Sequence, residues 1–520
     1  MLARWRPGGR IGWSSLPLHP VGIAAVPVLF LFAQNAEQQV TLAPLWAPLG
    51  LALAGSVAAL LVFSVLFRDR LRGALAASLV LALFFTYGHA WNLLGSPTDG
   101  RGWLAVAYAA LGVIGLVVIW RGRRWVRPAT GFLNLAVTLL VAFNVVRIGD
   151  FALGSIGPDQ PASVPPPIAI GQPARKPDIY YIILDRYAGP QTLERVYGYD
   201  NEPFLTALED RGFAIARDAW ANYFKTALSV ASSLSMEYLD ADALTADEPS
   251  SFGPVFGMLR GHLAVPETLK ALGYDYVHLG NYWEPTATNV DADVSLRFQD
   301  ASEFGAAVRS TTALSLLSPP QQPDDDPETA EFPELARDTT LYAFDRLEEA
   351  AGRAGPTFVF AHILVPHPPY VFDADGSMPT EQERRERPET AEYVHQLEWA
   401  NGRVLQAIDH LLDVPSGQEP IIILQADEGP WPPAFSRDQK HFQWLDATPD
   451  EIAWKFGILN ALYLPGTDAE AAGVTARLSP VNEFRVVFDA FFGADLPLLP
   501  DVTYLSPDYD HLYDFVPYTR

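Results

Sequence analysis

The chain of 520 residues contains no cysteine. Disulfides, thiolate metal sites and a cysteine nucleophile are therefore excluded. Residues 1–150 also lack lysine, and their only charges are twelve arginines and four acidic residues, a formal charge of +8. The remaining residues carry 24 basic and 57 acidic side chains, a formal charge of −33. We expect the two parts to meet different surroundings, and the acidic part has no basic stripe with which to bind nucleic acid.

Long apolar runs dominate the first part. Five runs without charge occur, at residues 11–36, 42–67, 73–97, 102–120 and 128–146. About 20 apolar residues are needed to cross the hydrocarbon layer of a membrane, so the sequence predicts five transmembrane helices. The alternative is a set of helices buried in a large soluble core, and five such runs in 150 residues disfavour it.

The distribution of arginine predicts the orientation of these helices. Basic residues precede the first run and follow the second and the fourth: Arg4, Arg6, Arg10, Arg68, Arg70, Arg72, Arg121, Arg123, Arg124 and Arg127. The positive-inside rule places the N-terminus in the cytoplasm and, after five spans, everything beyond residue 151 outside. We therefore expect a multi-pass protein of the cytoplasmic membrane, with residues 1–151 as its transmembrane domain and the first helix retained rather than cleaved as a signal peptide.

A proline-rich stretch, residues 152–177, predicts an extended linker. Beyond it, residues 178–520 alternate short apolar runs with longer amphipathic stretches such as 332–352 and 389–412. The short runs are 178–184, 274–280, 357–365, 421–426 and 457–464. This alternation predicts an extracytoplasmic α/β domain whose mostly parallel central sheet is covered by helices. In such folds the sites form beyond the carboxyl ends of the strands.

Two residues near the start of this domain can carry chemistry. Asp185 ends the first apolar run, where its carboxylate can bind a cation or cap the turn before Gly189. Thr226 opens a stretch of small and apolar residues that suits a buried helix. It can serve as an N-cap, or as a hydroxyl nucleophile at a helix end that favours an anionic substrate.

Later strand ends supply further candidates. Asp427 and Glu428 follow the run "IIILQA" directly, and they either cap a turn or hold a cation. In "AHILVPHPPYVF", His362 lies inside the run and is expected to be a core residue, whereas His367 lies past its end and can contact substrate. Spacing does not decide the role of His441 in "QKHFQW".

The order of these elements resembles the alkaline phosphatase/sulfatase superfamily. An early strand ends in Asp185, Thr226 opens a helix about 40 residues later, an "HPP" loop follows in mid-domain, and a late strand ends in "D-x-G". Five leading helices with an external domain resemble its membrane branches, of the lipoteichoic acid synthase type and the phosphoethanolamine transferase type. The resemblance extends from about residue 177 to about residue 505 and includes "FGILNALYLPG" and "SPVNEFRVVFDAFFG".

The resemblance implies roles for the candidates. Asp185 and Asp427 would bind one metal ion, Thr226 would be both nucleophile and ligand, and His367 would contact the transferred or leaving group. Sulfatases proper have Cys or Ser followed by x-Pro-x-Arg, and the sequence Thr-Ala-Leu-Ser at 226–229 departs from that pattern. Sulfate-ester hydrolysis is therefore disfavoured.

A second departure concerns the metal. The family usually has His after the late Asp, where this chain has Glu428. Three carboxylates around a divalent cation leave a charge of about −1 and favour a hard ion, so we expect Mn²⁺ or Mg²⁺ rather than Ca²⁺ or Zn²⁺. The added charge would repel an anionic substrate unless Lys225, His367 or His441 compensates.

The sequence thus predicts a membrane-anchored, metal-dependent hydrolase or transferase that acts on phosphate esters at the cell envelope through Thr226. Its substrate would be a phospholipid or a lipid-linked glycan held in the bilayer. Two alternatives stay open: a relative without catalytic activity that has a binding or structural role in the envelope, and a sulfuric or phosphoric ester hydrolase for small substrates. The oligomeric state does not follow from the sequence.

Overall fold

The structure is a computed structural model that describes residues 15–35, 42–94, 101–122, 124–155, 168, 170, 171, 173, 175–244, 250–298, 303–317 and 333–520. Most of the predicted linker, together with Arg4, Arg6, Arg10 and Arg123, lies outside these residues. The chain forms two compact units. One comprises Met1–Gly157 and Ser302–Glu331, and the other comprises Pro158–Ala301 and Phe332–Arg520. The sequence pattern did not distinguish residues 302–331 from the domain that surrounds them.

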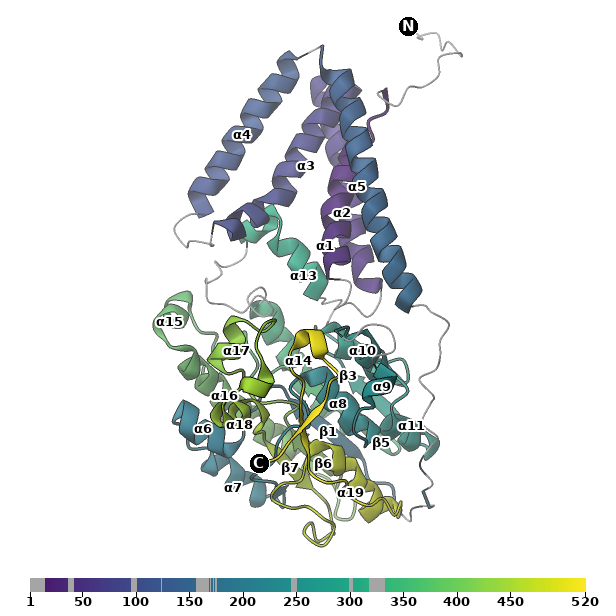
Figure 1. The fold of residues 1–520 in the computed structure, drawn as a ribbon, viewed down its shortest axis with the longest axis vertical. Coiled ribbons are helices and arrows are strands. Elements are labelled where there is room, and N and C mark those ends of the chain that lie inside the picture. The colour runs from purple at the N-terminus through teal and green to yellow at the C-terminus, as the bar shows by residue number, and fades with distance from the viewer. Residues whose placement is uncertain are drawn as a thin grey trace. The chain divides into compact units, whose positions relative to one another are not determined.

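The first unit is a bundle of helices (Figure 1). Its helices are α1 (His19–Gln34), α2 (Ala43–Phe67), α3 (Arg70–Leu93), α4 (Arg101–Arg121), α5 (Val126–Ser155), α13 (Glu303–Ser310) and the 3₁₀-helix η3 (Ala313–Leu317). Four of them, α2 to α5, are long and apolar enough to cross a membrane, whereas α1 has 16 residues and is shorter. Four predicted spans are therefore confirmed in length and composition. The first predicted run, 11–36, extends beyond the described residues at both ends.

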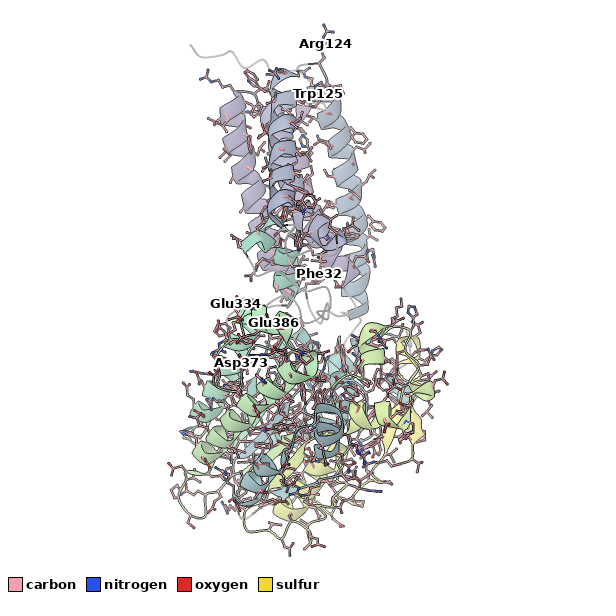
Figure 2. All side chains as sticks on the ribbon, turned by 90° about the vertical axis from the view of Figure 1, so that its left-hand side faces the viewer. Phe32, Arg124, Trp125, Glu334, Asp373 and Glu386 are labelled. Carbon is pink, nitrogen blue, oxygen red and sulfur yellow. The ribbon has the colours of Figure 1, made fainter. Side chains whose placement is uncertain are left out.

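Apolar side chains hold this bundle together. Helix α1 packs against α2, α3 and α5, and its buried Val28 and Phe32 form a cluster with Leu45 of α2 and Phe85 of α3. Between α2 and α3 the chain turns sharply, because Asp69 caps α3 by accepting hydrogen bonds from the backbone of its first turn. Figure 2 shows Arg124 and Trp125 at one end of the bundle and Phe32 toward the other.

The second unit contains a seven-stranded sheet with the order β2-β7-β6-β1-β5-β3-β4. The strands are β1 (Ile179–Leu184), β2 (Ala214–Ile215), β3 (Asp275–Leu279), β4 (Val294–Leu296), β5 (Thr357–Ile363), β6 (Ile421–Gln425) and β7 (Asn460–Tyr463). Strands β6, β1, β5, β3 and β4 are parallel, while β7 is antiparallel to β6 and β2 is antiparallel to β7. The mostly parallel sheet predicted from the sequence is therefore confirmed.

Helices cover this sheet (Figure 1). They are α6 (Pro190–Tyr197), α7 (Glu202–Glu209), α8 (Thr226–Ser235), α9 (Ala241–Leu244), α10 (Gly253–Leu259), α11 (Ala264–Ala271), α12 (Glu284–Ala287), α14 (Pro333–Ala350), α15 (Glu381–Glu386), α16 (Glu389–Leu412), α17 (Pro433–Arg437), α18 (Pro449–Phe456) and α19 (Pro480–Phe492). Every residue of β1, β5 and β6 is buried, as both covered faces require. A separate hairpin pairs β8 (Thr503–Leu505) with β9 (Val516–Tyr518).

Candidate active site

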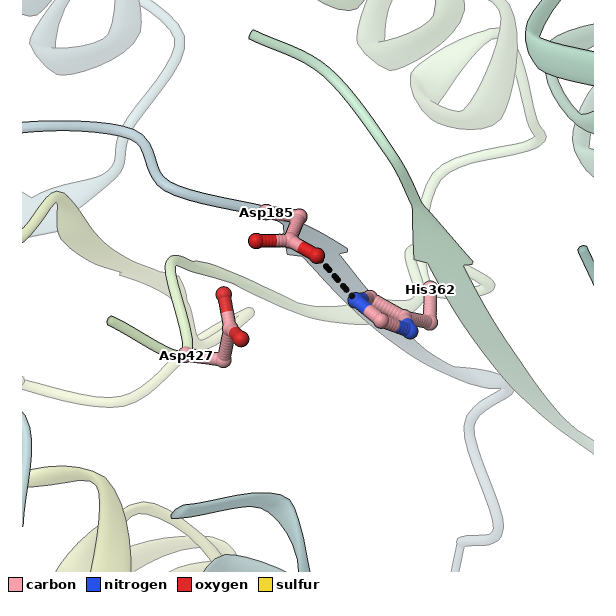
Figure 3. Close-up of side chains that lie close together, drawn as sticks. All are labelled: Asp185, His362 and Asp427. Carbon is pink, nitrogen blue, oxygen red and sulfur yellow. Dashed lines mark ion pairs between the residues drawn. The ribbon is translucent and has the colours of Figure 1, made fainter. Parts of the chain in front are cut away.

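Three central strands bring three side chains to one edge of the sheet. Strand β1 lies between β5 and β6, and all three run in the same direction. Asp185 directly follows β1, His362 is the penultimate residue of β5, and Asp427 lies two residues past β6. Each offers one ligand atom, and these atoms all lie within 4.8 Å of one another. Figure 3 shows the three side chains facing one another, with Nε2 of His362 3.2 Å from Oδ2 of Asp185.

This cluster fits a cation. All three side chains are buried, with exposed fractions of 3% for Asp185, 1% for His362 and 0% for Asp427. Oδ1 of Asp185 and Oδ2 of Asp427 are buried without a hydrogen-bond partner among the described residues. Unpartnered buried carboxylate oxygens are costly in the absence of a positive charge. Asp185, Asp427 and His362 would thus hold a divalent ion through two oxygens and one nitrogen.

The ring of His362 is fixed from its other side. Its Nδ1 lies 3.0 Å from Oγ1 of Thr286 and 3.2 Å from Nδ2 of Asn281. With Nδ1–H donating to the Thr286 hydroxyl, Nε2 keeps the lone pair that a metal requires. Such a second contact is usual for histidines that bind metals. His362 was expected to be a core residue. The structure shows that it is buried and that it is also part of the cluster.

Thr226 lies at the same edge of the sheet. It is the first residue of α8, and the N-cap position is occupied by Lys225, whose side chain caps nothing. The Thr226 side chain lies close enough to the carboxylate of Asp427 to act to lower its pKa. The N-cap role considered from the sequence therefore does not describe this threonine. Its hydroxyl combines contact with the cluster and a position on the positive end of a buried helix.

The two carboxylates of the cluster differ in proton affinity. Burial raises the pKa of Asp427 to about 8, and the charges of Asp185 and Glu428 add to the effect. Burial also acts to raise the pKa of Asp185, but the neighbouring His367, His362 and Arg186 outweigh it and lower the net value below the usual range. A bound cation would stabilise both carboxylates in their charged form.

Glu428 lies in a second buried cluster beside the first. Its Oε1 is 2.8 Å from Nζ of Lys455 and 3.4 Å from Nε of Arg186, and it accepts a hydrogen bond of 3.0 Å from Nε1 of Trp431. Burial acts to raise its pKa, but Lys455 and Arg186 lower the net value, so the carboxylate is ionised. All of these contacts are made by Oε1, whereas Oε2 is buried without a hydrogen-bond partner among the described residues. Glu428 is not part of the group formed by Asp185, His362 and Asp427.

His367 lies in the loop after β5 and is half-buried. Its backbone carbonyl accepts a hydrogen bond of 2.9 Å from Nε2 of Gln396 in α16. Burial, followed by the charge of Arg186, lowers the pKa of His367 to about 4, so the imidazole is neutral. The pKa of Asp185 responds to His367, so this side chain lies near the cluster of Asp185, His362 and Asp427.

The remaining two candidates lie apart from the three ligand atoms. Nζ of Lys225 is 4.5 Å from the ring centroid of Trp431 and 3.4 Å from Oε1 of Gln439. It therefore belongs to the surroundings of the Glu428 cluster. His441 is exposed, and its Nδ1 lies 2.8 Å from Oδ1 of Asp438 in the same turn. Its position gives no contact with Asp185, His362 or Asp427.

Arg186 and Lys455 were not singled out from the sequence. Arg186 directly follows Asp185, has a left-handed backbone (φ 61°), and stacks its guanidinium 3.4 Å from the ring centroid of Trp431. Its position beside a strand-end aspartate is the one signal that points to it. Lys455 comes from α18, and no local pattern links it to Glu428.

Comparisons with known proteins concern the second unit. No protein-family model matches the chain, and no curated protein matches it. Solved structures do resemble it. The C-terminal periplasmic domain of EcEptC from Escherichia coli, in complex with Zn, is 12% identical, with 67% of this chain and 97% of that chain covered and a TM-score of 0.41.

Two further structures are similar at the same level. The soluble domain of lipooligosaccharide phosphoethanolamine transferase A from Neisseria meningitidis is 12% identical over 62% of this chain and 90% of that chain, with a TM-score of 0.37. The lipoteichoic acid synthase LtaP from Listeria monocytogenes is 13% identical over 66% of this chain and 82% of that chain, with a TM-score of 0.39.

Proposed function

We propose that this protein is a membrane-anchored, metal-dependent enzyme that transfers a phosphoryl or substituted phosphoryl group through Thr226. The observation that carries the proposal is the position of Thr226, the first residue of α8, near Asp427 of the buried Asp185–His362–Asp427 cluster. A nucleophilic hydroxyl, a helix N-terminus and a cation-binding cluster at one sheet edge are what attack on a phosphate ester requires.

The metal-binding cluster supports one divalent ion. When bound, it would lower the pKa of the Thr226 hydroxyl and polarise a phosphoryl oxygen. Two carboxylates with a neutral histidine compensate a divalent charge, since Glu428 is neutralised by Lys455 and Arg186. Carboxylates suit Mn²⁺ and Mg²⁺, and the imidazole adds affinity for Mn²⁺ and Zn²⁺, so we favour Mn²⁺ with Zn²⁺ as its competitor.

Asp427, Thr226 and His367 have different roles in the proposed reaction. Asp427 lies near the hydroxyl of Thr226, and Oγ of Thr226 attacks phosphorus from the N-terminal end of α8. The Oγ–P bond forms while the bond from phosphorus to the leaving oxygen breaks, and the proton of the hydroxyl passes to that oxygen. We assign this proton exchange to His367, whose imidazole is neutral. Attack by water or an acceptor hydroxyl then breaks the Oγ–P bond and restores Thr226.

The helices that can cross a membrane limit the kinds of substrate to be considered. Helices able to cross a membrane in the same chain suggest a donor or acceptor that is itself held in the bilayer, such as a phospholipid or a lipid-linked glycan. Following the positive-inside rule, we place the catalytic unit on the outer side of the cytoplasmic membrane. A hydrolase for small esters would use the same chemistry with water as the acceptor.

The test uses the purified full chain in proteoliposomes with Mn²⁺ and labelled phosphatidylethanolamine or phosphatidylglycerol, alongside small phosphate and sulfate esters. We expect label to reach an acceptor and intact mass to reveal an adduct on Thr226. Thr226→Ala should lose both signals, Thr226→Ser should keep a measurable part, and Ser235→Ala, at the other end of α8, should leave both unchanged. Turnover confined to small esters would favour the hydrolase. An unchanged cellular role for Thr226→Ala without any turnover would favour the binding protein.

A further inference from the structure

The segment between β4 and α14 returns from the catalytic unit to the membrane unit. Residues 302–331 are grouped with the helical bundle, although the sequence on both sides belongs to the α/β unit. Within the described part of this segment, α13 packs against α1 and α2. Phe304 of α13 is buried (2% exposed), and its ring meets Phe32 of α1 edge-on at a centroid distance of 5.3 Å. One face of α13 is therefore part of the bundle's core.

The second half of the segment packs on α3. Ala313 of η3 contacts the cluster formed by Tyr87, Trp91 and Leu104. Gly88 permits this approach, because a Cβ at that position would lie 2.0 Å from the backbone oxygen of Ser310. Such close backbone contact fixes η3 against the end of α3.

Three leucines of η3 are exposed. Leu314 and Leu316 are each 41% exposed, and Leu317 is 84% exposed. The chain that follows, residues 318–331, has the sequence SPPQQPDDDPETAE, which offers four prolines, acids and amides but no large apolar side chain. The residues that follow therefore have no large apolar side chains with which to cover these leucines.

The leucines continue an apolar surface that belongs to the ends of the membrane-type helices. Leu93 and Leu94 at the end of α3, and Trp103 at the start of α4, are exposed beside the cluster on which η3 packs. Trp and Leu at the ends of spans are typical of the layer where headgroups meet acyl chains. Phe32, which contacts this segment, lies toward the end of the bundle opposite Arg124 and Trp125 (Figure 2). The arginine-rich end is the cytoplasmic one under the positive-inside rule, so the segment lies at the outer end.

We propose that η3 is a membrane-interface anchor whose Leu314, Leu316 and Leu317 insert into the headgroup–acyl boundary of the outer leaflet. The partner is the lipid bilayer itself, and the interaction is apolar burial rather than recognition of one headgroup. The catalytic unit then joins the membrane unit at three points along the chain, near residues 157, 301 and 331, instead of one. This inference depends on the membrane-spanning role of α2 to α5 and is independent of the reaction proposed for Thr226.

The absence of cysteine makes the test direct, because a single introduced cysteine can carry an environment-sensitive fluorophore. The full chain would be labelled at Leu317→Cys or Leu314→Cys and reconstituted into phosphatidylglycerol/phosphatidylcholine vesicles. Ser416→Cys, in an exposed turn of the catalytic unit, is the reference for water, and Leu111→Cys, exposed in the middle of α4, is the reference for the hydrocarbon layer.

We expect iodide quenching at residue 317 to be about fivefold weaker than at residue 416. A nitroxide near the lipid headgroup should quench residue 317 more than one near the chain end, and the reverse should hold at residue 111. Iodide quenching equal to that at residue 416 would overturn the proposal. Protection from both iodide and nitroxide lipids would also overturn it, because protein would then cover the leucines. Since both positions are exposed, the substitutions leave the packed face of the segment intact.

Discussion

The carboxylate of Glu428 lies 2.8 Å from Nζ of Lys455, and both side chains are buried. Arg186, stacked on Trp431, adds a second cation 3.4 Å from the same oxygen. These contacts determine the electrostatics of the neighbouring cluster, because they compensate a charge that would otherwise act on the metal and on an anionic substrate. In this arrangement the carboxylate of Glu428 pairs with the side chains of Lys455 and Arg186.

The first prediction concerns this ion pair. Lys455→Met removes the cation that lies 2.8 Å from the buried carboxylate of Glu428. Loss of one partner of a buried pair destabilises by about 3 kcal/mol. Unfolding of the full chain in detergent should show this loss. The double variant Lys455→Met/Glu428→Gln should recover part of it, since the buried carboxylate is then gone, although Arg186 loses it as a partner. An unchanged midpoint for Lys455→Met would mean that the two groups do not interact as the structure places them.

The second prediction separates two neighbouring acids by their metal content. Asp427→Asn removes a charged donor from the proposed metal site and should weaken divalent-metal binding at least about tenfold, whereas Glu428→Gln should leave it close to that of the wild type. Elemental analysis after dialysis and titration with Mn²⁺ measure both. Equal losses in the two variants would make Glu428 a ligand, as the family pattern implies. Wild-type protein that binds no divalent metal would refute the proposed mechanism.

The sequence indicated which residues lie at the edge of the sheet better than it indicated the contacts that they make there. Parallel strands end at the same edge, so Asp185 and Asp427 could be expected to meet once "IYYIIL" and "IIILQA" were recognised as strands. His362 was harder to assign, because a histidine inside a fully buried strand gives no signal of which neighbours it faces. Lys455 lies in α18, 27 positions after Glu428, which lies in the loop after β6, so their pairing depends on tertiary packing alone. The packing of α13 against the bundle is likewise a long-range contact, and the sequence of its eight residues does not predict it.

The third prediction concerns the loop that carries His367. Gln396 donates to the carbonyl of His367 at 2.9 Å and accepts from the backbone N–H of Val371 at 2.7 Å, so it fixes both sides of the loop. Gln396→Ala should lower kcat about tenfold with a smaller change in KM, because the loop loses its orientation while the metal-binding cluster stays intact. Gln382→Ala, at an exposed position, is the control. Equal kinetics for the two variants would show that Gln396 does not position His367.

The fourth prediction concerns His278, a buried histidine of β3 whose Nε2 lies 2.8 Å from the carbonyl of Thr286. Burial lowers its pKa from 6.5 to about 4. Between these values the unfolded chain binds a proton that the folded chain does not, so the stability present above pH 6.5 is lost as the pH falls toward 4. The contribution is about 3 kcal/mol. In unfolding experiments across this range, His278→Gln should lose pH-dependent stability less steeply than the wild type. Identical slopes would contradict the assignment.

The fifth prediction tests the close contact between α3 and the inserted segment. A Cβ on Gly88 would lie 2.0 Å from the Ser310 oxygen and 2.5 Å from the carbonyl carbon of Thr311, both backbone atoms that cannot rotate away. Gly88→Ala should therefore displace η3 from α3 and expose the segment to limited proteolysis in reconstituted vesicles, even though alanine favours the helix itself. Gly55→Ala in α2 has nothing within 4 Å of its Cβ and provides the matched control, with unchanged or slightly higher stability. If the cleavage rates of the two variants were equal, the segment would not depend on this contact, and its attachment would rest on Phe304 and the leucines of η3 instead.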